Sequence, residues 1–171
     1  EPGGTYIGEL IRNLLFVDSK NKMCIETEFL LFAASRAQHF CEVVIPSLEK
    51  GKIVISDRMD NSSLAYQGYA GGADIGMIKS VNKWATQDVK PNIVFYIKID
   101  VPTALSRMTN RGKSTDFEQR YKTFLAKVET GFETIFKNKE NVITINGQLT
   151  IDQLADQAYQ HIQKYLQKNA K

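Results

Sequence analysis

The sequence predicts an α/β protein whose parallel sheet is covered by helices on both faces, and two observations lead to this class. Long segments with helical spacing of apolar residues alternate with short runs rich in β-branched residues. These runs are almost continuously apolar, as in strands that helices cover on both sides. The three runs are Ile53–Ser56, Ile93–Ile97 and Val142–Ile145.

Six helices are expected between and around these strands. Their ranges are Tyr6–Phe16, Ile25–Lys50, Ala73–Thr86, Thr103–Thr109, Phe117–Lys137 and Thr150–Gln167. Thr150 and Gln153 have the spacing of a capping box, which marks the start of the last helix. The glycine-rich stretch Gly68–Gly76 is expected to be a loop or a loosely held start of a helix. We find no repeat and no second domain, so residues 1–171 are expected to form a single domain.

The composition excludes several classes of protein. Of the 171 residues 43% are hydrophobic and 24% are charged, which is ordinary for a soluble domain and unlike a disordered chain. No apolar run approaches the roughly 20 residues of a membrane span, and the first residues do not resemble a signal peptide. A net charge of +3 without a dense basic block gives little support to nucleic-acid binding. We therefore expect a cytoplasmic protein that binds neither membrane nor nucleic acid.

The two cysteines do not indicate a disulfide or a zinc site. Cys24 and Cys41 fall in or beside an expected helix and lack a CxxC partner, and His39 and His161 are the sequence's two histidines. Free cysteine commonly packs as a small apolar residue. Both cysteines are therefore expected to be buried packing residues.

The stretch from Asp57 to Gly68 leaves the carboxyl end of an expected buried strand, where ligands bind in open α/β sheets. An aspartate there can hold Mg²⁺, and the neighbouring Arg58 offers a planar fork for phosphate oxygens. A helical turn would bring several polar side chains toward one pocket. They are Ser62, Ser63, Tyr66 and Gln67. The alternative interpretation is a structural pair in which Asp57 and Arg58 merely cap the strand end.

A second candidate site lies in the long expected helix. Phe32 and Arg36 are four residues apart and so share one helical face. Together an aromatic ring and a guanidinium can hold a flat base, one by stacking and the other by donating hydrogen bonds to ring oxygens. The alternative is that Phe32 belongs to the core and Arg36 is solvated.

The third candidate is the polar and basic stretch at about residues 107–118, between two expected helices. Such a segment can act as a lid that brings Arg107 and Arg111 onto a transferring phosphate and excludes water. The alternative is a solvated loop. The run Gly112–Ser114 is similar to the end of a P-loop, but residue 107 is not the required glycine and no strand precedes it, so that match is rejected.

Taken together, these stretches resemble the thymidylate kinases, P-loop enzymes that phosphorylate dTMP with ATP. Glu1–Thr5 resembles the EPGGT turn of this family, and Leu31–Gln38 its LFAASR helix. Asp57–Gly68 is similar to its DRxxxSSxAYQG segment and Pro91–Ile97 to the strand that begins with proline. The resemblance runs from the first residue nearly to the last and implies a P-loop NTPase-like fold of three layers.

The sequence departs from the family pattern at one point. The family's Walker A motif, GxxxxGK[ST], occurs nowhere in it. We expect the sequence to be a piece that lacks a strand, the P-loop, a helix and a second strand. These 171 residues alone are then expected to show no turnover, because the lysine that cradles the ATP phosphates is missing.

The resemblance implies roles for individual residues. Phe32 would stack on thymine, Arg36 would hydrogen-bond its carbonyl edge, and Ser63 and Gln67 would complete the contacts with the base. Tyr66 would stand where a ribose 2′-hydroxyl would have to fit. Arg12 and Arg58 would bind the monophosphate, and Asp57 would lie near Mg²⁺. Arg111, and with weaker support Arg107, would bring charge to the transferring phosphoryl group, as in the bacterial-type enzymes.

The leading expectation is therefore an ATP- and Mg²⁺-dependent dTMP kinase that acts as a homodimer. A related nucleoside-monophosphate kinase with another base preference is the first alternative. The second is a nucleotide-binding fragment without catalytic activity. Base preference separates the first alternative from the leading expectation, and turnover with ATP and dTMP separates the second.

Overall fold

The computed structural model describes residues 2–17, 23–109 and 115–169, with side chains described at all of these except 108–109 and 115–120. The chain falls into two compact units. One comprises Glu1–Lys90 with Phe124–Ile135, and the other Pro91–Thr123 with Phe136–Lys171. In the described residues the first unit is helical, whereas the second carries the sheet.

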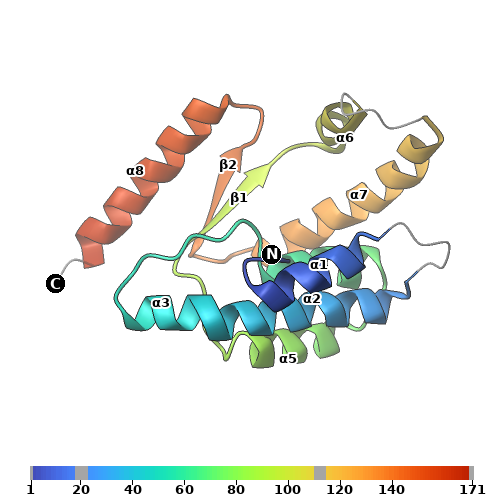
Figure 1. Ribbon diagram of the computed structural model, residues 1–171. Coiled ribbons are helices and arrows are strands. Elements are labelled where there is room, and N and C mark those ends of the chain that lie inside the picture. Colours follow the sequence, from blue (N-terminus) through green and yellow to red (C-terminus); the bar gives the residue numbers. More distant parts are fainter. Residues whose placement is uncertain (1, 18–22, 110–114, 170–171) are drawn as a thin grey trace. The chain divides into compact units, whose positions relative to one another are not determined.

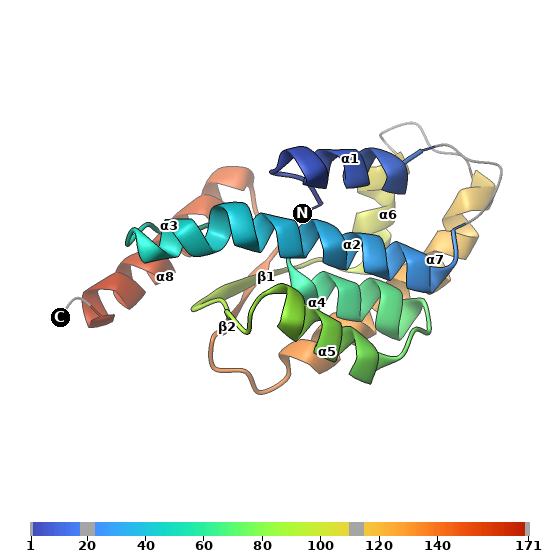
Figure 2. The ribbon, with the colours of Figure 1, turned by 60° about the horizontal axis from the view of Figure 1, so that its bottom comes forward.

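Most of the first unit is a succession of helices. In chain order they are α1 (Tyr6–Leu15), α2 (Ile25–His39), η1 (Phe40–Val44), α3 (Ile45–Glu49), α4 (Asp60–Ser63), η2 (Leu64–Ala70) and α5 (Ile75–Ala85). The segments η1 and η2 are π-helical. α2, η1 and α3 follow without a break and confirm the long helix expected over Ile25–Lys50. Figures 1 and 2 show α2 lying between α1 and α5.

A tight turn joins the start of the chain to α1. Gly3 and Gly4 have φ angles of 123° and 85°, a region that favours glycine. The backbone N–H of Gly3 donates to the Ser35 hydroxyl of α2 over 3.2 Å. Thr5 then caps α1 by accepting from the Gly8 N–H at 3.0 Å. The turn is thereby attached to α2, on the helix that also carries Phe32 and Arg36.

The core of the first unit is built on one face of α2 and its π-helical continuation. Phe29, Ala33 and Phe40 on this face are each at most 4% exposed, and their spacing is that of one helical stripe. Ala65 from η2 and Ile78 from α5 are 0% and 1% exposed. Because Arg36 belongs to the same buried stripe, it is carried into the interior by the helix's packing.

One expected strand is not formed. Ile53–Ser56 belongs to neither described strand and to no described helix, so this prediction was wrong for the described structure. A strand is defined by hydrogen bonds to a neighbour, and the sheet of the described residues consists of two other strands. Ile53 is 69% and Ile55 is 84% exposed. The apolar pattern of this run therefore predicted neither the pairing nor the exposure of these residues correctly.

The second unit confirms the predicted parallel sheet. β1 (Val94–Lys98) pairs in parallel with β2 (Val142–Asn146), with Val94 opposite Val142. α6 (Val101–Thr109) follows β1, and α8 (Ile151–Asn169) follows β2. Between the strands the chain forms α7 (Thr115–Phe136), of which Phe124–Ile135 belongs to the first unit. Thr150 and Gln153 form the predicted capping box, with their backbone N–H groups donating over 3.0 and 3.3 Å to each other's side-chain oxygens. Figure 1 shows the paired strands.

The turn after β2 requires a glycine. A Cβ atom on Gly147 would lie 2.3 Å from Ile99 Cγ2 and 3.0 Å from the Lys98 carbonyl oxygen. We expect Gly147→Ala to destabilise the protein by about 1–3 kcal/mol, because β1 has to move away from the added methyl group. Urea unfolding of the two proteins measures the difference. A change below about 0.5 kcal/mol, the usual effect of a surface substitution, would contradict this close approach.

Asp100 caps α6 and has a lowered pKa. Its carboxylate accepts hydrogen bonds from the side chain and the backbone N–H of Thr103, the latter at 2.7 Å, and from Gln148. These bonds favour the ionised form. The cap therefore contributes stability above the ordinary pKa of 3.8, and this is lost as the pH falls through the lowered value of the folded protein. We expect carboxyl NMR to place the Asp100 midpoint below 3.8; a midpoint above it would contradict the cap.

No helix in the described part of the chain combines the length and the apolar character that crossing a membrane requires.

Candidate functional site

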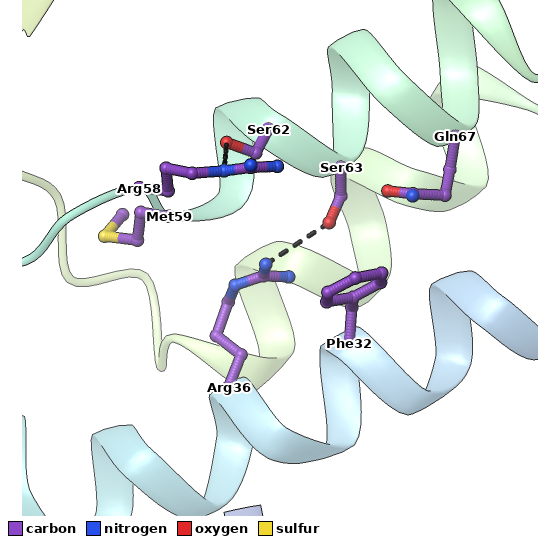
Figure 3. A pocket seen from close by; sticks show the side chains of 7 residues that line it. All are labelled: Phe32, Arg36, Arg58, Met59, Ser62, Ser63 and Gln67. Carbon is purple, nitrogen blue, oxygen red and sulfur yellow. Dashed lines mark hydrogen bonds between the residues drawn. The ribbon is translucent and has the colours of Figure 1, made fainter. Parts of the chain in front are cut away.

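A small pocket lies between α2 and the segment that runs from Arg58 through α4 into η2. Its lining residues are Phe32, Arg36, Arg58, Met59, Ser62, Ser63 and Gln67. Figure 3 shows these side chains converging from the two sides. The free space is about 20 Å³, room for about one water molecule. A larger ligand can enter only if one of the lining side chains moves.

Arg36 forms the buried charged wall of this pocket. The residue is 2% exposed, and its guanidinium donates to the Asn82 side-chain oxygen at 2.7 Å and to the Ser63 hydroxyl at 3.2 Å. A buried cation is tolerated only where polar groups replace its hydration. Asn82, 3% exposed and carried by α5, provides one of these groups. The planar fork of Arg36 is thus fixed in direction before any ligand arrives.

Gln67 forms the opposite polar wall. It projects from η2, is 4% exposed, and donates through its side-chain N–H to a carboxylate oxygen of Glu28 at 2.7 Å. Glu28 lies near the start of α2, one turn before Phe32. In Figure 3 the ring of Phe32 lies below Gln67 and Ser63. The pocket therefore combines one aromatic ring, one cation and one amide.

Arg58 lies at the exposed side of the pocket. Its φ angle of 71° places it in the left-handed region, which is uncommon for a residue with a side chain. Its guanidinium carbon is 4.7 Å from the centre of the Tyr66 ring, and its Nε donates to Ser62 at 3.1 Å. Backbone outliers of this kind cluster at functional sites. Because Arg58 is exposed, it is the lining residue best placed to swing aside.

The structure brings together six of the residues selected from the sequence: Phe32, Arg36, Arg58, Ser62, Ser63 and Gln67. Tyr66 lies next to this group, with its ring beneath the Arg58 guanidinium. The centre of its ring is 6.1 Å from that of Phe124 and 6.2 Å from that of Phe132. The helical turn expected over Ser62–Gln67 is formed by α4 and η2.

Arg12 and Asp57 are not among the residues that line the pocket. Arg12 donates to the Pro2 carbonyl at 2.9 Å and lies over the Phe16 ring at 5.4 Å. Asp57 is exposed and directly follows Ile53–Ser56. Of the four residues expected to hold the base and the monophosphate, the pocket is thus lined by Phe32, Arg36 and Arg58 but not by Arg12.

The expected lid is described only in part. Arg107, in the second unit, donates to the Gly147 carbonyl at 2.9 Å and so links α6 to the turn after β2. Arg111 lies outside the described residues, as does the rest of 110–114. The described side chains contain no group of three or more His, Cys, Asp or Glu that could hold a metal ion by itself.

Sequence reasoning missed two residues of the site. Asn82 lies in an amphipathic helix and Glu28 in the first turn of another, both ordinary positions for polar residues. Their partners are distant in sequence, 46 residues away for Asn82 and 39 for Glu28. No local motif connects them, so only the packing of α2 against α5 and η2 reveals either pair.

This arrangement can bind a flat heteroaromatic ring and read its polar edge. A ring packed on Phe32 would meet a hydrogen-bond donor in Arg36 and an amide in Gln67, while an anion attached to the ring would be attracted by Arg58. The lining residues include no Cys, His, Asp or Glu that could serve as a nucleophile or general base. Binding and orientation are therefore the chemistry that this pocket provides.

Comparison with known proteins points to one family. The family model described as thymidylate kinase matches residues 1–158. The chain is 36% identical over 169 residues to the thymidylate kinase of an Exiguobacterium species, which covers 98% of this chain and 80% of that protein. It is 40% identical over 168 residues to that of Fervidobacterium nodosum, covering 97% and 82%. With that of Thermosipho melanesiensis it shares 42% identity over 157 residues, covering 92% and 77%.

Proposed function

The chain belongs to the thymidylate kinase family, and we propose that the pocket between α2 and η2 binds the acceptor nucleotide of that family's reaction. The reaction is the transfer of the γ-phosphate of ATP to dTMP, which gives dTDP and ADP. The family has a P-loop NTPase fold, in agreement with the mixed α/β structure and its parallel strands. The comparisons favour neither alternative raised from the sequence.

One observation carries the assignment of the base site: Phe32, Arg36 and Gln67 line the same pocket from two elements. We assign Phe32 to stacking on thymine and Arg36 to donating to a ring carbonyl oxygen. Ser63, which already accepts from Arg36, and Gln67 complete the polar contacts. Because Phe32 and Arg36 both project from α2, the aromatic ring and the guanidinium can contact the base without any movement of this helix.

The sugar and phosphate are assigned to the exposed side of the pocket. Arg58 is exposed and interacts with the Tyr66 ring and Ser62. A phosphate monoester would attract its guanidinium away from the ring, which would widen the pocket at the same time as it holds the ligand. We place Tyr66 beside the sugar, where it excludes a 2′-hydroxyl. Arg12 would join the phosphate after giving up the Pro2 carbonyl.

We also propose which groups stabilise the charge that develops during phosphoryl transfer. Asp57 is an exposed carboxylate, and Mg²⁺ in phosphoryl-transfer sites needs one or two carboxylates beside phosphate oxygens and water, so its chemistry fits. A bound Mg²⁺ would neutralise charge that develops on the phosphates. Arg111 is the lid arginine that we propose at the transferring group. Arg107 could join it only by releasing Gly147. The lid would belong to a single kinase domain that includes both units.

A substrate panel tests the function. The full-length protein is assayed with ATP, Mg²⁺ and one of dTMP, dUMP, dCMP, dGMP or UMP, in a coupled assay for ADP. We expect dTMP to have the highest kcat/KM, and dUMP, which lacks only the 5-methyl group, to follow within about 10- to 200-fold. Preference for a purine or for a ribonucleotide would overturn the proposed acceptor site.

We also propose a homodimer formed through the helical face of the first unit. Tyr6, Leu10 and Leu14 are 80%, 53% and 51% exposed and lie four residues apart along α1. Leu30 of α2 and Trp84 of α5 add exposed apolar surface on the two neighbouring helices. Exposed apolar side chains on neighbouring helices support an association surface. Sedimentation should give a dimer that Leu10→Glu dissociates; a wild-type monomer at micromolar concentration would contradict it.

The cytoplasm is the compartment that we propose. Cys24 and Cys41 both have free thiols and both are exposed, so the expectation that they are buried was wrong. Exposed thiols persist where the surroundings are reducing. This supports a reducing compartment, and mass spectrometry of alkylated protein from freshly broken cells checks it by finding both thiols reduced.

A further inference from the structure

The hydrogen bond between Gln67 and Glu28 has a consequence for the choice of base. Gln67 is 4% exposed, and the bond from its side-chain nitrogen to Glu28 Oε1 is 2.7 Å long. Glu28 itself does not line the pocket, whereas Gln67 does. Any influence of Glu28 on a bound base therefore acts through the amide of Gln67.

Glu28 fixes which way this amide points. An ionised carboxylate only accepts hydrogen bonds, so it can face the NH₂ group of the amide but not its oxygen. With the NH₂ group held by Glu28, the amide oxygen is left for the pocket. Figure 3 shows the oxygen end of Gln67 on the side of Ser63.

The two polar walls of the pocket then present a defined pattern to a ligand. Gln67 offers an acceptor, and the guanidinium of Arg36, fixed by Asn82 and Ser63, offers donors. Thymine and uracil have the complementary edge, with an N3–H donor beside the C4 carbonyl acceptor. Cytosine has the reverse, with N3 as acceptor and the C4 amino group as donor. A cytosine in this position would face like groups on both walls.

We propose that Glu28 is a positioning residue that holds the amide oxygen of Gln67 toward the acceptor base, and so selects a 4-oxo pyrimidine against cytosine. This inference rests on the proposed assignment of the pocket to dTMP. Glu28 does not touch the base. It acts by preventing a rotation of the amide that would convert the wall from an acceptor to a donor.

The test compares dTMP with dCMP in the full-length protein and its Glu28→Gln variant. A glutamine at position 28 can donate or accept, so both orientations of Gln67 become satisfied. We expect the ratio of kcat/KM for dTMP to that for dCMP to fall at least about tenfold, the scale of one mispaired buried polar group. KM for ATP should not change. Glu28→Ala is a second variant. It removes the acceptor for the Gln67 amide, which can then rotate, and we expect the same fall in the ratio.

The chain offers a matched control on the same continuous helix. Gln38 donates through its side-chain nitrogen to Glu42 in an exposed pair four residues apart. Glu42→Gln makes the same chemical change outside the pocket and should leave the dTMP to dCMP ratio unchanged. A loss of selectivity in this control as large as that in Glu28→Gln would overturn the proposal. The loss would then follow from removing a negative charge and not from the hydrogen bond to Gln67.

A double variant separates positioning from a structural role. If Glu28 acts through Gln67, then Glu28→Gln should have no further effect on the ratio once Gln67→Ala has removed the amide. An equal loss with and without Gln67 would overturn the proposal. The wild-type protein tests the underlying assignment independently: if it does not prefer dTMP to dCMP, the proposed function fails. If it does and Glu28→Gln keeps the preference, only the role of Glu28 fails.

Discussion

Replacing Arg36 by alanine is expected to lower kcat/KM for dTMP by about two to three orders of magnitude, with KM for ATP nearly unchanged. Removing one partner of a buried hydrogen-bonded charged group costs about 2–5 kcal/mol or more, and the middle of this range, about 3–4 kcal/mol, corresponds to two to three orders of magnitude. Arg36 is 2% exposed, and its fork is fixed by Asn82 and Ser63. Steady-state kinetics with each substrate varied in turn measures both effects.

Two further measurements separate recognition by Arg36 from structural damage. Arg36→Lys keeps the charge but not the planar fork, so it should also reduce the use of dTMP strongly. Urea unfolding shows how much stability each variant loses through the unpaired Asn82. Lys79→Ala removes an exposed cation from α5 in the same unit and should leave dTMP kinetics intact. Equal losses in the kinetic constants for dTMP and ATP would count against the role given to Arg36.

Ile78→Ala is expected to destabilise the protein by about 2–5 kcal/mol, the usual cost of emptying a buried isoleucine site. Ile78 is 1% exposed on α5, one turn before Asn82. The cavity would loosen α5 beneath Arg36, so we also expect KM for dTMP to rise. Thermal and urea unfolding measure the first effect, and kinetics below the unfolding transition measures the second.

The neighbouring residue provides the matched comparison for Ile78. Met77 has a side chain of similar size on the same turn of α5 but is 61% exposed. Met77→Ala should change stability by about 0.5 kcal/mol or less, as surface substitutions do. Similar losses in the two variants would show that burial on α5 does not stabilise the site.

The sequence predicted the helices of this protein well because their signals are local. The capping box at Thr150 and the spacing of apolar residues both act within a turn or two of one helix. Ile53–Ser56 failed because a strand depends on a second segment, and the described residues provide none for it. The same run of β-branched residues predicts an extended backbone whether or not a neighbour is present.

In the candidate site too, the features that depend on local spacing could be predicted, whereas those that depend on packing between helices could not. Phe32 and Arg36 share a helical face, so their spacing alone brought them together, and the turn over Ser62–Gln67 followed from a similar argument. The partners that fix their directions could not be found this way. Asn82 and Glu28 reach the site through the packing of separate helices, which depends on side-chain shape over the whole unit.

The exposed isoleucines Ile53 and Ile55 carry a risk for handling these 171 residues as an isolated chain. Ile53, Val54 and Ile55 form a short β-branched stretch without charge, and two of the three are largely exposed. An exposed run of β-branched residues can pair with the same run in another copy of the chain. Lys52 and Asp57 lie on either side and act as gatekeepers through charge repulsion between stacked copies. High ionic strength screens that repulsion, so concentrated samples should precipitate sooner in salt.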